Sequence, residues 1–248
     1  MQHPRTYAVY AYLAAGGATL GGLALASALL GDRDGRFWWP LSRLGSQAML
    51  DICGVTKLVV EGAARLEHAG PAVVVANHES LFDPAVLMKA SESPLRFIVK
   101  RDVERFPVFG RALSAMGHVF VDRGDDGQTS DGLRLAAEAI RDGKTVMAFP
   151  EGTRAEGDAL LPFRRGAFEL AITAKVPIVP IGISGTRGIL PKHGGWRRRG
   201  PVALAVGEPI ATTTWIPSEA EVLAARARDE VARLRTRARA LCENGRSA

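Results

Sequence analysis

The chain has 248 residues, of which 47% are hydrophobic and 23% are charged, so intrinsic disorder is excluded as its default state. This length suits one large domain with a short additional segment, and the two distant cysteines, Cys53 and Cys242, exclude a disulfide scaffold and a CxxC redox site. The formal net charge of +6 favours anionic partners: nucleic acid, anionic lipid or phosphorylated metabolites. Nucleic acid is the weakest of these, because aromatic residues make up only 6% and no basic stripe is interleaved with them.

The N-terminal region contains an apolar run from Thr6 to Gly31 without a charged residue. The run exceeds the roughly 20 residues that cross a bilayer, although its many Ala and Gly residues make insertion marginal. A membrane anchor, a cleaved signal peptide and a buried helix of a soluble protein are all compatible with it, and its length and flanks favour the anchor. Residues 1–56 are therefore predicted to be a hydrophobic membrane-anchoring segment.

From residue 57 onward, short β-branched apolar runs alternate with helical patterns. Residues 72–76 are all apolar, which predicts a strand buried on both faces. The alternation predicts an α/β layered domain with a parallel or mixed sheet. Strands are expected at residues 58–60, 72–76, 97–99, 119–121, 146–149, 178–181 and 202–206, and helices at 131–141 and 166–174.

The last segment, residues 218–248, is predicted to form a basic helix and tail. Ser218 and Glu221 have the spacing of a capping box at its start. Arginines recur along the helix, and they fit a solvated face and a contact with anionic membrane equally well.

The first candidate site is the segment NHESLFD at residues 77–83, directly after the fully apolar strand. His78 is the natural general base near neutral pH. Five residues of continuous helix rotate by about 140°, which would point His78 and Asp83 apart. A turn is expected instead, with Asp83 and Pro84 at a helix start and the carboxylate returned to the imidazole. The alternative is that Asp83 only caps the helix.

The second candidate site is the segment FPEGTR at residues 149–154, after another apolar strand. Gly152 permits a tight turn, Thr153 offers a hydroxyl, and Arg154 can bind a phosphate or carboxylate bidentately. Glu151 is expected to orient Arg154 or a substrate hydroxyl. The alternative is a surface turn that contains an ion pair.

Two further segments complete the pattern. GHVFVDR at residues 117–123 is a predicted strand that ends in Arg123, a second cationic group. VPIVPI at residues 176–181 is expected to be structural, and its prolines predict an edge strand or a bulge.

Together the four segments resemble the motifs of the glycerolipid acyltransferase family, the membrane-associated 1-acyl-glycerol-3-phosphate acyltransferases. They occur in the family's order and approximate spacing, and the resemblance covers about residues 57–210. The basic segment FRRG at residues 163–166 also resembles one that often follows FPEGTR in this family. The resemblance implies the glycerolipid acyltransferase fold, an α/β fold with a mixed, largely buried sheet flanked by helices, and an acyltransferase catalytic domain at residues 57–217.

The resemblance also implies a reaction. His78 would deprotonate the free hydroxyl of a lysophospholipid, and Asp83 would orient and charge-stabilise His78. The oxygen would attack an acyl thioester, carried by coenzyme A or acyl carrier protein, and lysophosphatidate would become phosphatidate. No metal or cofactor is required.

The family's acceptor-binding motif matches Glu151, Gly152, Thr153 and Arg154, with Arg154 and Arg123 on the phosphate and Lys100 as a further candidate. The resemblance implies a membrane-associated protein whose site faces the cytoplasm. Two alternatives stay open. One is another acceptor: glycerol 3-phosphate, another lysophospholipid or a lyso-aminolipid. The other is a non-catalytic protein that binds anionic lipid.

Overall fold

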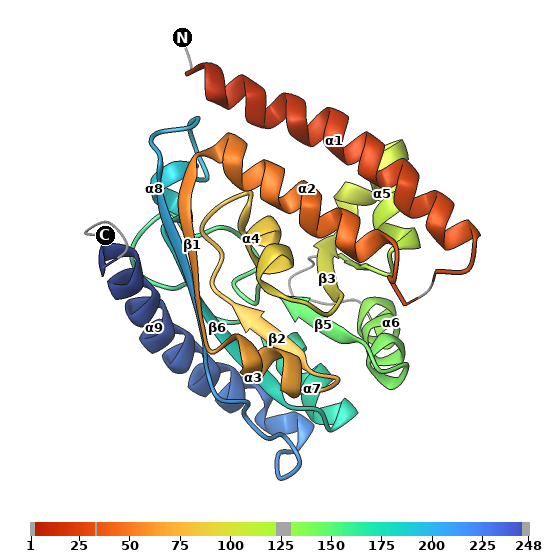
Figure 1. Cartoon of the computed structure of the whole chain (residues 1–248). Coiled ribbons are helices and arrows are strands. Elements are labelled where there is room, and N and C mark those ends of the chain that lie inside the picture. Colours follow the sequence, from red (N-terminus) through yellow and green to blue (C-terminus); the bar gives the residue numbers. More distant parts are fainter. Residues whose placement is uncertain (1–2, 33, 123–129, 245–248) are drawn as a thin grey trace.

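The computed structural model describes residues 3–32, 34–122 and 130–244 of the chain. Its strands are β1 (Val55–Glu61), β2 (Val73–Ala76), β3 (Leu95–Lys100), β4 (Val119–Val121), β5 (Thr145–Ala148), β6 (Ile178–Ser184) and β7 (Gly200–Val206). They form one seven-stranded sheet in the order β1-β7-β6-β2-β5-β3-β4 (Figure 1). Only β6 and β7 pair antiparallel among these strands, so the predicted mixed sheet is confirmed.

Helices cover both faces of the sheet. The helical elements are α1 (Pro4–Leu29), α2 (Trp38–Cys53), α3 (Ala63–His68), α4 (Asp83–Ala90), η1 (Arg101–Arg105), α5 (Pro107–Ala115), α6 (Ser130–Arg141), α7 (Gly166–Ala174), α8 (Thr186–Ile189), η2 (Pro217–Glu219) and α9 (Ala220–Asn244). On one face α2 and α4 pack against the sheet, and α1 lies outside them against α2 and α5 (Figure 1). On the other face lie α6, α7 and α9.

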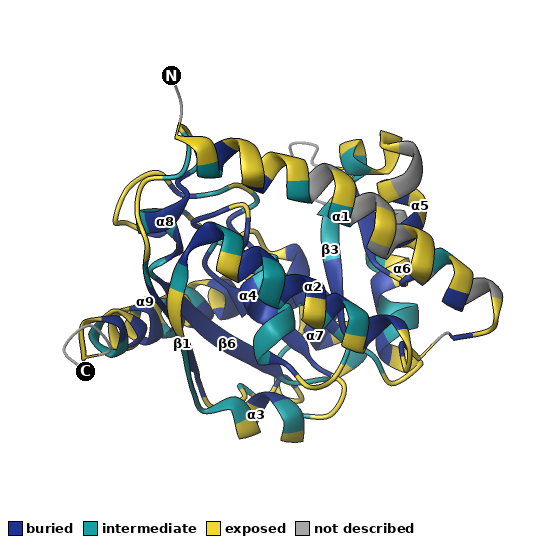
Figure 2. Ribbon diagram, turned by 45° about the horizontal axis from the view of Figure 1, so that its top comes forward, coloured by how far each residue is buried: buried dark blue, intermediate teal, exposed yellow. Residues whose placement is uncertain are grey.

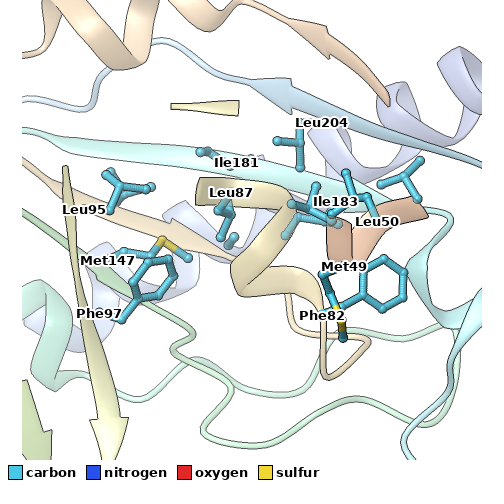
Figure 3. Close-up of a cluster of buried hydrophobic side chains, with 14 of the residues drawn as sticks. Met49, Leu50, Phe82, Leu87, Leu95, Phe97, Met147, Ile181, Ile183 and Leu204 are labelled. Carbon is cyan, nitrogen blue, oxygen red and sulfur yellow. The ribbon is translucent and has the colours of Figure 1, made fainter. Parts of the chain in front are cut away.

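Strand β2 lies in the middle of this arrangement and is fully buried, as its apolar sequence predicts. Val74 and Ala76 point into the core beneath α2 and α4, whereas Val73 and Val75 point into the core beneath α7 and α9. Figure 3 shows part of the first of these cores, in which side chains from α2 and α4 meet side chains from the sheet. Its labelled residues are Met49, Leu50, Phe82, Leu87, Leu95, Phe97, Met147, Ile181, Ile183 and Leu204.

Strand β6 shows that the prediction of an edge strand or bulge for VPIVPI is wrong. β6 lies between β2 and β7, and Pro180 pairs in register with Val75. The main-chain oxygen of Pro180 accepts a hydrogen bond from Gly207 N at 2.9 Å, so the missing N–H of Pro180 would point to the same side. Pro180 therefore lies at the end of the β6–β7 ladder, whose first paired residue is Ile181. Its missing N–H interrupts no hydrogen bond inside that ladder.

The structure also bears on the predictions for the C-terminal helix and the N-terminal apolar run. The expected capping box of Ser218 and Glu221 is not formed; instead, the side chain of Glu219 accepts the N–H of Ile216 at 3.1 Å. At the other end, exposed residues recur along α1 (Figure 2). None of the helices among the described residues combines the length and apolar character that a membrane crossing requires.

His118, from the segment GHVFVDR, is a buried structural residue and only 5% exposed. Its Nδ1 accepts a hydrogen bond from Phe97 N at 3.0 Å, and its ring packs edge-on against Trp38. Burial lowers the pKa of His118 to about 3, and the positive charge of Arg96 acts in the same direction. His118 is therefore neutral in the folded protein at ordinary pH.

A His118→Gln variant is expected to flatten the pH dependence of unfolding. Below the ordinary histidine pKa of 6.5 the unfolded chain binds a proton at His118, whereas the folded chain binds it only near pH 3. The wild-type free energy of unfolding therefore decreases as the pH is lowered through this window, by about 1.4 kcal/mol per pH unit for this group. Urea denaturation across the window measures the slope. The exposed-site variant His68→Gln serves as the control, and equal slopes for wild type and His118→Gln would contradict the account.

Candidate active site

The sheet order places the ends of three motif-bearing strands side by side. Strands β2, β5 and β3 are adjacent and parallel, so their carboxyl ends share one edge of the sheet. His78 follows β2, Glu151 follows β5, and Lys100 ends β3. Arg123, predicted after β4, lies outside the described residues. Such an edge is where α/β proteins commonly place binding and chemistry.

His78 and Asp83 form the close contact that the expected turn requires. His78 Nδ1 lies 2.8 Å from Asp83 Oδ2, and Asp83 is the first residue of α4. The same oxygen accepts the main-chain N–H groups of Glu79 at 2.7 Å and Ser80 at 2.8 Å. The carboxylate is fully buried, whereas the imidazole keeps 17% of its surface exposed. Because Nδ1 faces a carboxylate, it carries the proton in the neutral ring, and Nε2 is left as the proton acceptor.

The strand end and the ring of His78 are held on several sides. The ring stacks on Phe149 from FPEGTR, with centroids 4.1 Å apart and planes 17° apart. The side chain of Asn77 donates to Ile183 O at 3.0 Å and accepts from Ile183 N at 2.8 Å, which ties β2 to β6 beyond its ladder. Ser80 Oγ donates to Leu190 O at 2.6 Å. The imidazole is therefore preorganised by its neighbours.

Glu151 connects the two motif loops and does not contact Arg154. Its Oε1 accepts the N–H of His78 at 2.8 Å, and its Oε2 accepts the N–H of Leu161 at 2.9 Å. Burial raises the pKa of the Glu151 carboxyl, and these two N–H donors oppose the rise. Ala155 N also donates to His78 O at 2.8 Å. Glu151 therefore does not orient Arg154, because both of its oxygens bind main chain. The other expected role, orienting a substrate hydroxyl, stays a prediction.

Of the remaining FPEGTR residues, Arg154 is a cation that pairs with none of the described residues. Gly152 has φ +71°, and a Cβ there would lie 2.8 Å from Arg164 Nε, so glycine fits this tight turn. Thr153 is exposed. Arg154 is half-buried and makes no hydrogen bond or ion pair with the residues that the structure describes. The alternative of a surface ion pair at this turn is thus not observed there, and the guanidinium can bind an anion.

Lys100, the other cation proposed for a phosphate, is differently placed. Its Nζ forms an ion pair with Asp102 in η1, and its side chain is 48% exposed. Lys100 shares the edge of the sheet with His78 but stands two strands away from it.

Comparison with known proteins gives the family. The family model described as Acyltransferase matches residues 57–184, which is more than half of the chain and includes NHESLFD and FPEGTR. The chain belongs to the acyltransferase family.

Several curated relatives are named as 1-acyl-sn-glycerol-3-phosphate acyltransferases. A chloroplastic 1-acyl-sn-glycerol-3-phosphate acyltransferase of Brassica napus is 35% identical over 187 residues, which cover 75% of this chain and 53% of the relative. The 1-acyl-sn-glycerol-3-phosphate acyltransferase alpha of Homo sapiens is 34% identical over 176 residues, 69% of this chain and 61% of the relative. The chain thus spans little more than half the length of these relatives.

The fold is shared with a solved acyltransferase. The crystal structure of the 1-acyl-sn-glycerophosphate acyltransferase from Thermotoga maritima matches with a TM-score of 0.74, covering 92% of this chain and 94% of that chain at 24% identity. The expected glycerolipid acyltransferase fold is therefore confirmed.

The basic helix α9 of this acyltransferase-family chain fits the predicted solvated face in part: Arg226, Arg233, Arg237 and Arg239 are exposed, whereas Arg228 and Arg235 reach the loops of the site. Arg235 is buried and pairs with the buried Glu79. Arg228 donates to the main-chain oxygens of Leu160 at 2.8 Å and Leu161 at 3.1 Å, in the loop after FPEGTR. Sequence reasoning missed these contacts. The available signal was the spacing of seven between the two arginines, two helical turns on one face, together with a glutamate directly after His78 in NHESLFD.

Histidine NMR is expected to show the neutral His78 ring protonated at Nδ1. The structure gives Nδ1 a carboxylate partner, so its proton resonance should lie at low field. In Asp83→Asn the side-chain oxygen still has to face the N–H groups of Glu79 and Ser80. The tautomer should therefore persist, while the resonance moves to higher field because the negative charge is lost. A wild-type ring protonated at Nε2 would contradict the assignment.

Proposed function

We propose that the protein transfers a fatty acyl group from an acyl thioester to the sn-2 hydroxyl of lysophosphatidate, forming phosphatidate. The observation that carries the proposal is the His78–Asp83 pair, with Nδ1 held by a buried carboxylate and the ring partly exposed. The loop of Arg154, which pairs with none of the described residues, is hydrogen-bonded to His78 through Ala155. The names of the relatives supply the reaction class, because they are 1-acyl-sn-glycerol-3-phosphate acyltransferases.

The proposed transfer has the following steps, which the His78–Asp83 contact supports. Nε2 of His78 takes the proton of the acceptor hydroxyl as its oxygen attacks the thioester carbonyl carbon. The imidazolium that forms is stabilised by the Asp83 carboxylate, which faces Nδ1. A C–O bond forms and the C–S bond breaks, and the proton on Nε2 passes to the leaving thiolate. The thiolate belongs to coenzyme A or acyl carrier protein, and no acyl-enzyme is formed.

The acceptor's phosphate is assigned to Arg154. This guanidinium lies in the loop that Glu151 ties to the main chain of His78, so the phosphate would be held at a fixed distance from the base. Lys100 and Arg123, which follow neighbouring strands, remain candidates for a second phosphate contact.

Turnover of an acceptor panel tests the reaction. The protein receives a long-chain acyl thioester with lysophosphatidate, glycerol 3-phosphate, another lysophospholipid or a lyso-aminolipid, and products are identified by mass spectrometry. Phosphatidate is expected. His78→Gln should lower kcat by at least about 100-fold, the usual contribution of a general base. Arg154→Met should raise KM for phosphate-bearing acceptors by about 10-fold or more, since it removes a charge-assisted contact.

Other outcomes of the panel have definite meanings. If only a different acceptor gave product, the proposed acyl transfer would stand and lysophosphatidate would be wrong as the acceptor. A folded protein without turnover on either donor, or a fully active His78→Gln, would overturn the proposal in favour of a lipid-binding protein.

We also propose that the protein works at a membrane, with its site facing the cytoplasm. Arg5 and residues 197–199 are four arginines without an ion pair to any described residue. They are neighbours in space: Arg5 stacks on Trp196, and Arg5 and Arg199 both lie beside Gly54. The loop that carries residues 197–199 follows α8, and its start accepts the hydroxyl of Ser80 at Leu190 O, so it borders the catalytic edge.

Exposed aromatic side chains accompany these arginines. Tyr7 and Tyr10 of α1 are 60% and 49% exposed, and Phe106, directly after η1, is 63% exposed. Aromatic and basic side chains together suit the boundary of a bilayer, and the anionic cytoplasmic leaflet attracts the basic ones.

Vesicle binding tests the membrane proposal. Replacing Arg197, Arg198 and Arg199 together by Gln is expected to weaken binding to phosphatidylserine-containing vesicles by about 100-fold, at about 1 kcal/mol per arginine. Arg226→Gln, which removes an exposed charge on α9, should leave binding unchanged. Equal binding of the triple variant and wild type would overturn the role of this surface.

A further inference from the structure

Glu79 and Arg235 form an ion pair inside the protein, between the NHESLFD loop and α9. Arg235 Nε donates to Glu79 Oε1, and the two side chains are only 10% and 4% exposed. By contrast, the pair of Arg237 with Glu61 on the same helix is about half exposed. A buried pair of charges is weak evidence for stability, because removing both charges from water has a large cost. The burial of the Glu79–Arg235 pair therefore needs an explanation other than stability.

The pair touches both catalytic loops. Glu79 follows His78 directly, and its main-chain N–H is one of the donors that hold Asp83 Oδ2, at 2.7 Å. The same guanidinium that binds the Glu79 carboxylate also donates through Nη1 to the main-chain oxygen of Asp158. Asp158 lies in the loop after FPEGTR. One side chain therefore bridges the loop of the base and the loop of Arg154.

Helix α9 reaches this position because of a glycine in β6. A Cβ on Gly182 would lie 2.1 Å from the main-chain nitrogen of Arg235, so only glycine lets the helix backbone lie this close to the strand. Figure 1 shows α9 running along β6 for much of its length. The side chain of Arg235 thus starts from a rigid support.

A second set of hydrogen bonds connects α9 to the same two loops. Arg228, two turns before Arg235, donates to Leu161 O, while Leu161 N donates to Glu151 Oε2. Glu151 Oε1 in turn accepts the N–H of His78. The helix is connected to the base through Glu151 on one side and through Glu79 on the other.

The charge of Arg235 explains why these two loops depend on it. Burial raises the pKa of Glu79, and the neighbouring Asp83 carboxylate raises it further, while Arg235 and Arg187 oppose the rise. Without the guanidinium, a buried carboxylate would lie next to the one that holds His78. Repulsion or protonation would then disturb the turn from Glu79 to Asp83.

We propose that Arg235 is a positioning residue for the acyl transfer: it fixes the His78–Asp83 pair relative to the FPEGTR loop by binding Glu79 and the Asp158 carbonyl together. This inference rests on the proposed function. Arg235 touches no reacting atom, and it acts through the two loops that it joins.

Kinetics of Arg235 variants test the proposal, with His78→Gln and wild type measured alongside. Arg235→Met should lower kcat by about 10- to 100-fold with little change in KM, because the reacting groups are misaligned while the binding groups remain. Arg235→Lys keeps the charge but presents a single ammonium group, so it should restore kcat only in part. Arg237→Met, from the exposed pair on the same helix, should keep wild-type kcat.

Loss of folding is separated from loss of alignment by a second variant. Glu79→Met with Arg235→Met removes both charges and leaves no unpaired buried ion, so it is expected to unfold at a temperature near that of wild type. It should nevertheless keep the low kcat. A folded double variant with wild-type kcat would overturn the proposal, as would an Arg235→Met that loses no more activity than Arg237→Met.

A readout without turnover distinguishes failure of this inference from failure of the proposed function. If wild type shows no turnover, the proposed function fails, and the Nδ1 proton resonance of His78 still reports the alignment. That resonance should shift in Arg235→Met and in the double variant and stay in place in Arg237→Met. An unshifted resonance in the folded Arg235 variants would overturn the positioning role.

Discussion

The contact on which the site depends is the buried oxygen Oδ2 of Asp83, which faces three N–H groups at once. A carboxylate shielded from water needs such donors, and a hydrogen bond to a charged group contributes about 1.5–3 kcal/mol. Two of the donors are main-chain groups of the preceding turn, so the chain after β2 has to curl back on itself. The third is the imidazole of His78. Satisfying one buried charge therefore fixes both the turn and the tautomer of the ring.

This local solution is embedded in long-range contacts. The order of the sheet puts the ends of β2 and β5 next to each other, and Glu151 then joins them by accepting the N–H of His78. On the far side, α9 supports the same loops through Arg228 and Arg235. The candidate active site is thus a set of loops that hold one another, rather than side chains projecting independently from a scaffold.

How much of this could be predicted from the sequence depends on the range of each interaction. The apolar runs predicted every strand, and the spacing of His78 and Asp83 predicted their contact, because these signals are local. The role of Glu151 was misjudged, since its partner His78 lies 73 positions away. Arg235 was missed for the same reason, as Glu79 lies 156 positions away. A pattern within one segment cannot report a partner that only the folded sheet brings close.

Pro180 shows a different limit of sequence reasoning. The absence of an N–H argues for an edge strand only if a ladder bond is needed at that residue, and this depends on where the neighbouring strand ends. The relevant neighbour, β7, lies further along the chain and runs in the opposite direction. Its register with β6 is a property of the assembled sheet.

The way in which the loop after FPEGTR is tied down has a consequence for motion. Main-chain or carboxylate hydrogen bonds hold this loop at Ala155, Asp158 and Leu161, to the β2 loop, to α9 and to Glu151. Opening it as a lid would break several of these bonds together. The side chains of Arg154 and Thr153 make no hydrogen bond with the described residues, so they can move without breaking these bonds. Side-chain rotations take picoseconds to nanoseconds, whereas lid opening takes microseconds to milliseconds.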